Sequence, residues 1–232
     1  VGILCSERLI PIFQRSFPGI PIALRAVPIP KPVVREEFES LMTFSELGQR
    51  FRSSMKSFRP TAGFLKPNAA RVLQLRQRYL GAQTSSLIVG LSWRSTHPEI
   101  GQLKSGTLAE WSTLFSIDGV TFVDLQYGTT EREREQLPVS MRRKLIHDDA
   151  IDPLTDIDAA AAQVAAMDLV ISVSGTTAHL AGALGIPVWI LLAPTRGRIW
   201  YWFSNREDSP WYKSATLLTA DVGAGGLRPP SS

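Results

Sequence analysis

The chain has 232 residues, a formal net charge of +4 and 44% hydrophobic residues, which suits one large domain or one and a half ordinary ones. Its single cysteine, Cys5, excludes a disulfide framework and gives no indication of secretion. The chain starts at Val1, and no basic segment followed by an apolar one suggests a signal peptide. We therefore expect it to be a piece of a longer polypeptide.

The first third of the chain predicts an irregular α/β pattern. Pro28, Pro30 and Pro32 interrupt it, because proline continues neither a helix nor a strand. The expected elements are strands at Val1–Cys5 and Ile20–Ala26, with helical segments at Glu7–Arg15, Glu36–Phe58 and Ala69–Leu80. A complete doubly wound domain needs over ~100 residues. We therefore expect residues 1–82 to hold the tail of one such domain and a linker.

The rest of the chain alternates apolar, β-branched runs with helical patterns. Strands are predicted at Leu87–Leu91, Val120–Leu125, Lys144–His147, Leu169–Val173, Val188–Leu192 and Ala215–Leu218. Helices are predicted at Thr107–Phe115, Thr129–Met141, Asp158–Met167 and Thr176–Leu184. Such alternation is typical of βαβ units, and continuously apolar strands indicate a sheet covered on both faces. We predict an α/β fold with a doubly wound parallel sheet over residues 83–222, followed by a flexible tail over 223–232.

One uncharged stretch, residues 169–195, is long enough to cross a membrane. Serine, threonine and glycine residues and Pro187 divide it into strand, helix and strand. No membrane span is predicted.

Positive charge is concentrated in one stretch. Between Leu47 and Pro98 there is no Asp or Glu, and the cations there are Arg50, Arg52, Lys56, Arg59, Lys66, Arg71, Arg76, Arg78 and Arg94. Such a stretch favours an anionic partner, namely a phosphate, a nucleic acid or an acidic surface. It also fits a solvated face beside acidic segments, and both interpretations stay open.

A strand, a Ser-Gly-Thr-Thr turn and a helix of small residues follow one another between Val170 and Pro187. Ser174 or Thr176 is expected to cap the helix and Gly185 to end it. The N-terminus of such a helix presents free N–H groups at the carboxyl edge of a parallel sheet, where a diphosphate binds readily. An ordinary strand-to-helix connection has the same pattern.

Several segments stand in the order of one known family: Arg8–Gly19, Val89–Arg94, Phe122–Gly128 with Trp111 before it, Val170–Pro187 and Arg206–Tyr212. They resemble the bacterial heptosyltransferase-like glycosyltransferases of the GT-B type, including those fused to tetratricopeptide repeats. The resemblance implies that residues 83–222 form the nucleotide-sugar-binding domain and that residues 1–82 end the acceptor-side domain.

The resemblance also implies an activity. It is the transfer of a sugar from a nucleoside-diphosphate-sugar donor to an acceptor hydroxyl by direct displacement, with no metal and no cofactor. The acceptor would be a saccharide, a lipid-linked saccharide or a protein, and the location cytoplasmic or at the periphery of the inner membrane. In this family the general base comes from the early acceptor domain, so this chain alone is expected to bind a donor without turning it over.

Residue roles follow from the same resemblance. Arg94 and His179 are the predicted catalytic residues: Arg94 stabilises the departing diphosphate, and His179 reaches a phosphate or the sugar. The predicted donor-binding residues are Ser92, Trp93, Gln126, Tyr127, Ser174, Gly175, Thr176 and Thr177.

Ser174 departs from the family, which usually has an aspartate at that position. This leaves the donor sugar open and supports a rival hypothesis, a catalytically inactive module that binds nucleotide sugars or serves as a scaffold. A further alternative is a nucleic-acid-binding module that uses residues 47–98, although no nucleic-acid motif is present and no nucleic acid partner is expected.

Two other patterns are given structural interpretations. The D-x-D sequence Asp156–Asp158 could chelate a metal ion, but we predict that it begins a helix, where Asp156 caps; no metal site is predicted. The late aromatic residues are predicted to pack, with at most one ring at a cleft: Trp200, Tyr201, Trp202, Trp211 and Tyr212.

Overall fold

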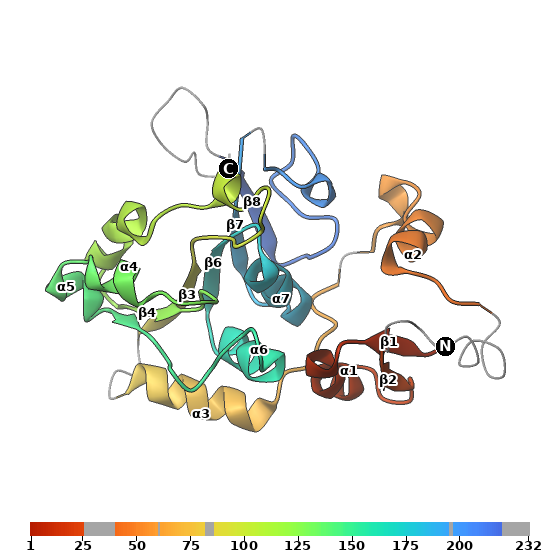
Figure 1. Cartoon of the computed structure of the whole chain (residues 1–232), viewed down its shortest axis with the longest axis horizontal. Coiled ribbons are helices and arrows are strands. Elements are labelled where there is room, and N and C mark those ends of the chain that lie inside the picture. Colours follow the sequence, from red (N-terminus) through yellow and green to blue (C-terminus); the bar gives the residue numbers. More distant parts are fainter. Residues whose placement is uncertain (26–39, 60, 82–85, 195–196, 220–232) are drawn as a thin grey trace.

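The computed structural model describes residues 1–25, 40–59, 61–81, 86–194 and 197–219. A six-stranded sheet forms the centre of the molecule, and a two-stranded sheet lies in its N-terminal part (Figure 1). The three prolines at 28, 30 and 32, the start of the predicted helical segment Glu36–Phe58 and the predicted tail over 223–232 lie outside the described residues. The division predicted at residue 82 stays a prediction.

The N-terminal part is a single small βαβ unit. Strand β1 (Ile3–Cys5) pairs in parallel with β2 (Ile22–Leu24), and the connection between them holds the 3-10 helix η1 (Glu7–Leu9) and helix α1 (Ile10–Ser16). The buried side chain of Ile12 joins α1 to helices of the large sheet. The two strands and the helix predicted here are confirmed, with shorter strands.

Three helical elements connect the two sheets: α2 (Phe44–Phe51), the 3-10 helix η3 (Met55–Ser57) and α3 (Ala69–Leu80). Helix α3 has the predicted bounds and packs against the large sheet, where Leu75 and Tyr79 are buried. Helix α2 stands apart from both sheets (Figure 1).

The large sheet contains β3 (Leu87–Ser92), β4 (Val120–Asp124), β5 (Leu145–Ile146), β6 (Leu169–Val173), β7 (Val188–Leu192) and β8 (Ala215–Thr219). All neighbouring strands are parallel and lie in the order β5-β4-β3-β6-β7-β8. The first strand of this sheet, β3, therefore lies in its centre. Strands β4 and β5 extend the sheet on one side of β3, and β6, β7 and β8 extend it on the other side. This is a doubly wound sheet, as predicted, and its strand order reverses between β3 and β6.

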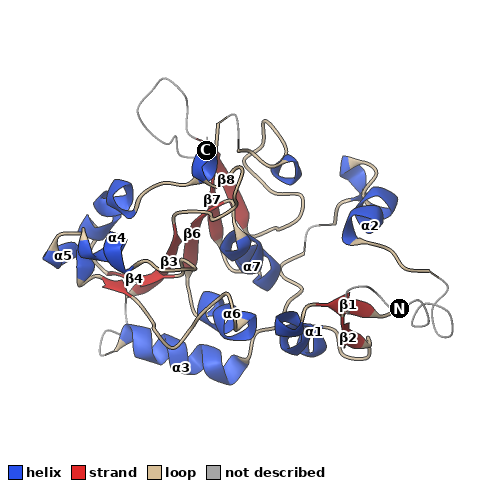
Figure 2. Cartoon of the chain, viewed as in Figure 1, coloured by secondary structure: helices blue, strands red, loops and turns tan. Residues whose placement is uncertain are grey.

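Helical segments cover the two faces of this sheet (Figure 2). Helix α3, α6 (Ile157–Ala165) and α7 (Thr176–Leu184) lie on one face, where Ile88, Val170 and Ile190 point. The 3-10 helix η5 (Leu108–Ser116) lies on the other, against Val89, Leu91 and Ile171. Side chains of β3 and β6 thus alternate between two apolar cores. On β7, Trp189 is 45% exposed. The remaining short elements are the 3-10 helices η4 (Gln102–Lys104) and η6 (Trp200–Trp202), and helices α4 (Glu131–Glu135) and α5 (Val139–Arg142). Within the described ranges no helix is long and apolar enough to span a bilayer.

The single helix predicted over Thr129–Met141 is wrong, because the structure divides it into α4 and α5. Pro138 lies between them in an extended conformation, with φ −51° and ψ 142°. Proline has no N–H to continue the hydrogen-bond ladder, and it disfavours helical geometry at the residue before it.

Candidate functional site

A cavity of about 480 Å³ opens at the carboxyl ends of β3, β4 and β6, beside the point where the strand order reverses. Ligands of doubly wound sheets bind in this crevice. The loop after β3, the loop after β4, the N-terminus of α7 and Arg8 of the N-terminal part all contribute to its wall. The lining residues include the cations Lys104 and Arg8, and the described part of the wall contains no Asp or Glu.

Helix α7 has Gly175 as its N-cap residue and therefore no side-chain cap. The predicted cap at Ser174 or Thr176 is therefore wrong: the Ser174 hydroxyl instead accepts a hydrogen bond from Trp202 Nε1 at 2.7 Å, and Thr176 already lies in the first helical turn. The N–H groups of that turn are left for water or a ligand. A Cβ added at Gly175 would meet only Val173 O, at 3.8 Å, so a ligand can approach the backbone closely here.

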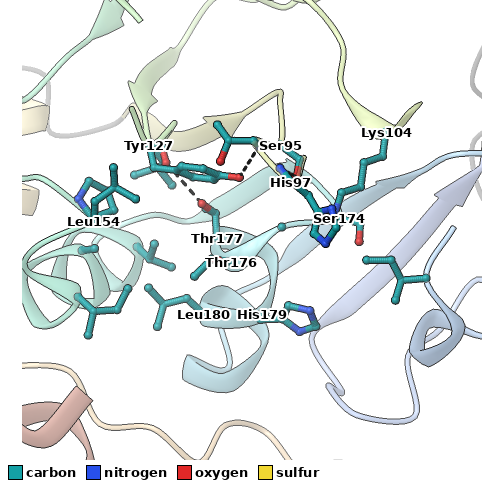
Figure 3. A pocket seen from close by; sticks show the side chains of 18 of the residues that line it. Ser95, His97, Lys104, Tyr127, Leu154, Ser174, Thr176, Thr177, His179 and Leu180 are labelled. Carbon is teal, nitrogen blue, oxygen red and sulfur yellow. Dashed lines mark hydrogen bonds between the residues drawn. The ribbon is translucent and has the colours of Figure 1, made fainter. Parts of the chain in front are cut away.

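Lys104 was not predicted, yet it is the buried cation of the cavity. Only 8% of it is exposed, and its Nζ donates to the backbone carbonyl of Ser174 at 2.6 Å (Figure 3). An ammonium has three donors, so two remain for a ligand. Burial lowers the pKa of Lys104 from its usual 10.5, an effect that nearby Tyr127 opposes. A buried cation is costly unless an anion is close, and a bound anion would supply that charge.

Tyr127 and Thr177 line the side of the cavity away from Lys104 (Figure 3). The Tyr127 hydroxyl accepts a hydrogen bond from the N–H of Thr96 at 3.0 Å, and the Thr177 hydroxyl donates to Leu125 O at 3.4 Å. Burial raises the pKa of Tyr127, but the Thr96 hydrogen bond and the positive charge of Lys104 outweigh burial and leave the pKa below its usual 10.

His179 is one turn inside α7 and also lines the cavity. Its Nδ1 lies 3.0 Å from the Tyr212 hydroxyl and its Nε2 3.0 Å from the Tyr201 hydroxyl, and its ring stacks on Trp202 at 4.9 Å. Burial, followed by the charge of Lys104, lowers the pKa of His179 to about 4. The imidazole is therefore neutral at pH 7, with a partner at each nitrogen.

Arg94 does not reach the cavity. Its Nε donates to the carboxylate of Glu133 at 2.9 Å, and its Nη2 donates to Thr129 O at 2.8 Å. Trp93 is fully buried, and its Nε1 donates to the same Glu133 carboxylate at 2.8 Å. Helix α4 thus holds the guanidinium away from the residues that line the cavity, and the role predicted for Arg94 at a diphosphate would require this ion pair to break.

Ser92 and Gln126 are buried behind the cavity wall. The Gln126 side-chain oxygen accepts from the N–H of Arg94 at 2.9 Å and from the Ser92 hydroxyl at 3.3 Å. These bonds fix the turn after β3. The structure therefore brings six of the ten predicted residues to the cavity: Tyr127, Ser174, Gly175, Thr176, Thr177 and His179.

The two D-x-D carboxylates lie at the start of α6, as predicted. Asp156 caps the helix by accepting from the N–H of Ala159 at 2.8 Å, and Asp158 forms an ion pair with Arg15. Among the late aromatics, Tyr201 lines the cavity and Trp202 is fully buried, as predicted. The packing predicted for Trp200 is wrong, because this side chain is 75% exposed.

Comparisons with known proteins add the following. No protein-family model matches the chain. Protein FlbA of Caulobacter vibrioides is 29% identical over 233 residues, which cover 95% of this chain and 38% of that protein. The solved structure of the ADP-heptose LPS heptosyltransferase II of E. coli has a TM-score of 0.48 and 16% identity, and the match covers 69% of this chain and 46% of that one. A glycosyl transferase family 9 structure from Veillonella parvula has a TM-score of 0.47 and 14% identity, with 67% and 42% covered. The chain spans less than half the length of each of these proteins.

Proposed function

We propose that this chain is the nucleotide-sugar-binding half of a glycosyltransferase of the GT-B type, and that its cavity holds the diphosphate of the donor. One observation carries the proposal: the buried ammonium of Lys104 and the uncapped N-terminus of α7 line the same carboxylate-free wall. Both features attract an anion. The sequence resemblance given above supplies the class of anion, a nucleoside-diphosphate sugar.

In the proposed reaction an acceptor oxygen attacks the anomeric carbon of the donor sugar as the bond from that carbon to the phosphate oxygen breaks. The acceptor proton passes to a general base, and the nucleoside diphosphate leaves with an added negative charge. Lys104 and the α7 N–H groups stabilise that charge, because fixed donors in a water-poor site act strongly on developing charge. The described lining has no carboxylate to act as base, so the base is assigned to another part of the full protein.

The rest of the cavity suggests how a donor lies in it. With the diphosphate at Lys104 and Gly175, the hydroxyl of Tyr127 and the apolar side chains of Leu154 and Val164 line one end, and we assign the nucleoside to this end. His179 and Tyr201 line the other side of the α7 terminus, and we assign the sugar to them. Both ring nitrogens of the neutral His179 already have hydroxyl partners, so this residue orients Tyr201 instead of pairing with a phosphate.

A thermal-shift panel of nucleoside diphosphates and their sugars tests the proposal. At least one of them should raise the melting temperature of the wild type. Lys104→Met should weaken its binding about 10- to 100-fold, since a hydrogen bond to a charged group contributes about 1.5–3 kcal/mol. Lys144→Met, at the amino edge of the sheet just before β5 and beside Asp118, is the control and should bind like the wild type. If no nucleotide stabilises the wild type, or Lys104→Met and Lys144→Met respond alike, the proposal fails.

An inactive binding module remains the second candidate, and Ser174 favours it. This residue replaces the family's usual aspartate, and Trp202 already occupies its hydroxyl. Sugar transfer measured on the full-length protein distinguishes the two. A donor that binds and exchanges but is neither transferred nor hydrolysed identifies the inactive module, whereas turnover that Lys104→Met abolishes identifies the transferase.

A further inference from the structure

The basic stretch between Leu47 and Pro98 divides into two parts with different surroundings. Its second part is largely neutralised within the protein, apart from Lys66, which is exposed and forms no ion pair within the described ranges. The ion pairs there are Arg71–Asp156 at 3.5 Å, Arg76–Asp168 at 2.7 Å, Arg78–Asp148 and Arg94–Glu133 at 2.9 Å. These cations hold α3 and the loop after β3 in place, so they offer little positive charge to a partner.

The first part keeps its charge exposed. Arg50, Arg52, Lys56 and Arg59 are all exposed, and within the described ranges none of them takes part in an ion pair. They occupy ten residues that begin inside α2 and end after η3. The free positive charge of the stretch is therefore concentrated on this segment.

Exposed apolar side chains lie on the same segment. Phe44 is 74% exposed, Phe51 is 57% exposed and Met55 is 44% exposed. Phe44, Leu47 and Phe51 are spaced by three and four residues, which places them on one stripe of α2. Such side chains cost free energy in water, and in the described structure nothing covers them.

Contacts within the chain fix both ends of this segment. Thr43 and Glu46 form a capping box at the start of α2, with Thr43 Oγ1 accepting from the N–H of Glu46 at 3.2 Å. At the other end Phe58 packs edge-to-face on Trp211 at 4.7 Å and on Phe203 at 5.8 Å. The exposed stripe is thereby attached to the unit that carries the cavity, although α2 itself projects away from it (Figure 1).

We propose that residues 41–59 bind the surface of a membrane that contains anionic lipids. The apolar stripe of α2 enters the boundary between headgroups and acyl chains, and the four cations bind the lipid phosphates. A basic amphipathic helix fits this environment because the acyl chains take up its apolar side chains while the headgroup phosphates pair with its cations. A nucleic acid duplex would contact the cations through its phosphates but leave the phenyl and thioether groups in water. Membrane binding would hold the cavity close to the lipid surface.

Vesicle co-sedimentation with the whole chain tests this proposal. Wild type should bind vesicles of phosphatidylcholine with 30% phosphatidylglycerol, and added salt should weaken the binding. Arg50→Gln combined with Arg52→Gln should weaken it about 30-fold at low salt, since each cation near such a surface contributes about 1 kcal/mol. Phe44→Ser combined with Phe51→Ser should weaken it at least about 10-fold and reduce the part that salt does not remove.

The matched control is Arg142→Gln combined with Arg143→Gln, two exposed cations at α5, which should leave binding unchanged. Melting temperatures of all three double variants check that folding is retained. The charge variant and the apolar variant change different residues, so each tests the proposal separately. The proposal is overturned if wild type ignores anionic vesicles, if the control loses as much binding as the Arg50 and Arg52 variant, or if oligonucleotides bind more tightly than vesicles and displace them. None of these outcomes depends on nucleotide binding at the cavity.

Discussion

Acidification is expected to destabilise this protein through His179, and replacement by glutamine should remove that dependence. Both ring nitrogens have hydroxyl partners at 3.0 Å, and the ring stacks on the buried Trp202. Protonation would place a charge in this apolar setting, near the positive charge of Lys104. Both effects lower the pKa of His179 from 6.5 to about 4 in the folded protein.

The sign and size of the effect follow from linkage between protonation and folding. Because the folded pKa lies below the unfolded one, the stability that neutral His179 contributes is fully present above pH 6.5 and is lost as pH falls toward 4. Each pH unit in that range corresponds to about 1.36 kcal/mol, which gives about 3 kcal/mol for the whole range. Partial exposure of the ring reduces this to about 2 kcal/mol.

Urea unfolding followed by tryptophan fluorescence at several pH values between 7.5 and 4.5 measures this effect. The difference in unfolding free energy between wild type and His179→Gln should be constant above pH 7 and shift by about 2 kcal/mol against the wild type at the acid end. Other titrating groups cancel in the difference, because both proteins share them. Parallel curves over the whole range would refute the reasoning. In Lys104→Met, the unfolding free energy should fall less steeply as the pH decreases than in the wild type, because one positive charge near the His179 ring is absent.

Three further outcomes are expected. Arg94→Ala should leave nucleotide binding in the thermal-shift panel unchanged, because the partner of Arg94 is Glu133 and not a ligand. It should lower the free energy of unfolding by about 1–2 kcal/mol. A loss of nucleotide binding would show that Arg94 contacts the nucleotide. Gly182→Ala should lower the unfolding free energy by about 1–3 kcal/mol in urea titrations, because the added Cβ would lie 2.4 Å from the Tyr212 ring. Nucleoside diphosphate binding at alkaline pH below 10.5 should be accompanied by proton uptake, because a bound anion raises the lowered pKa of Lys104. Calorimetry in buffers of different ionisation enthalpy detects this uptake, and Lys104→Met should take up no proton.

Much of the fold could be predicted because apolar periodicity determines it locally. The strands Leu169–Val173 and Val188–Leu192 and the helix Thr176–Leu184 have the predicted bounds. Gly185 ends that helix, as predicted, in the left-handed conformation with φ 78°. A residue that lacks a Cβ adopts this conformation without strain, so the sequence alone indicated the position.

The site was less predictable, because tertiary partners decide where polar side chains point. Ser174 suits a helix cap by residue type, but the distant Trp202 takes its hydroxyl. Arg94 follows the end of a strand as expected, but Glu133 of α4 binds its guanidinium. Lys104 ends the short 3-10 helix η4 and has no motif around it in the sequence. Only the folded chain brings its Nζ to the Ser174 carbonyl.

One residue, Ser174, relates these observations to each other. A carboxylate at this position, where the backbone carbonyl accepts from Lys104 Nζ, would bring a negative charge near the buried ammonium. With serine there, the indole takes the hydroxyl and the ammonium keeps only a neutral carbonyl. Burial lowers the pKa of Lys104, and the positive charge of Lys104 adds to the lowering that burial causes at His179. Burying a cation without a counter-charge lowers stability, and a bound diphosphate would supply the missing negative charge. The absence of a carboxylate from the described wall thus makes the cavity a stronger anion site. The binding half of the proposed function therefore follows more directly from this chain than the transfer step, whose base is assigned elsewhere.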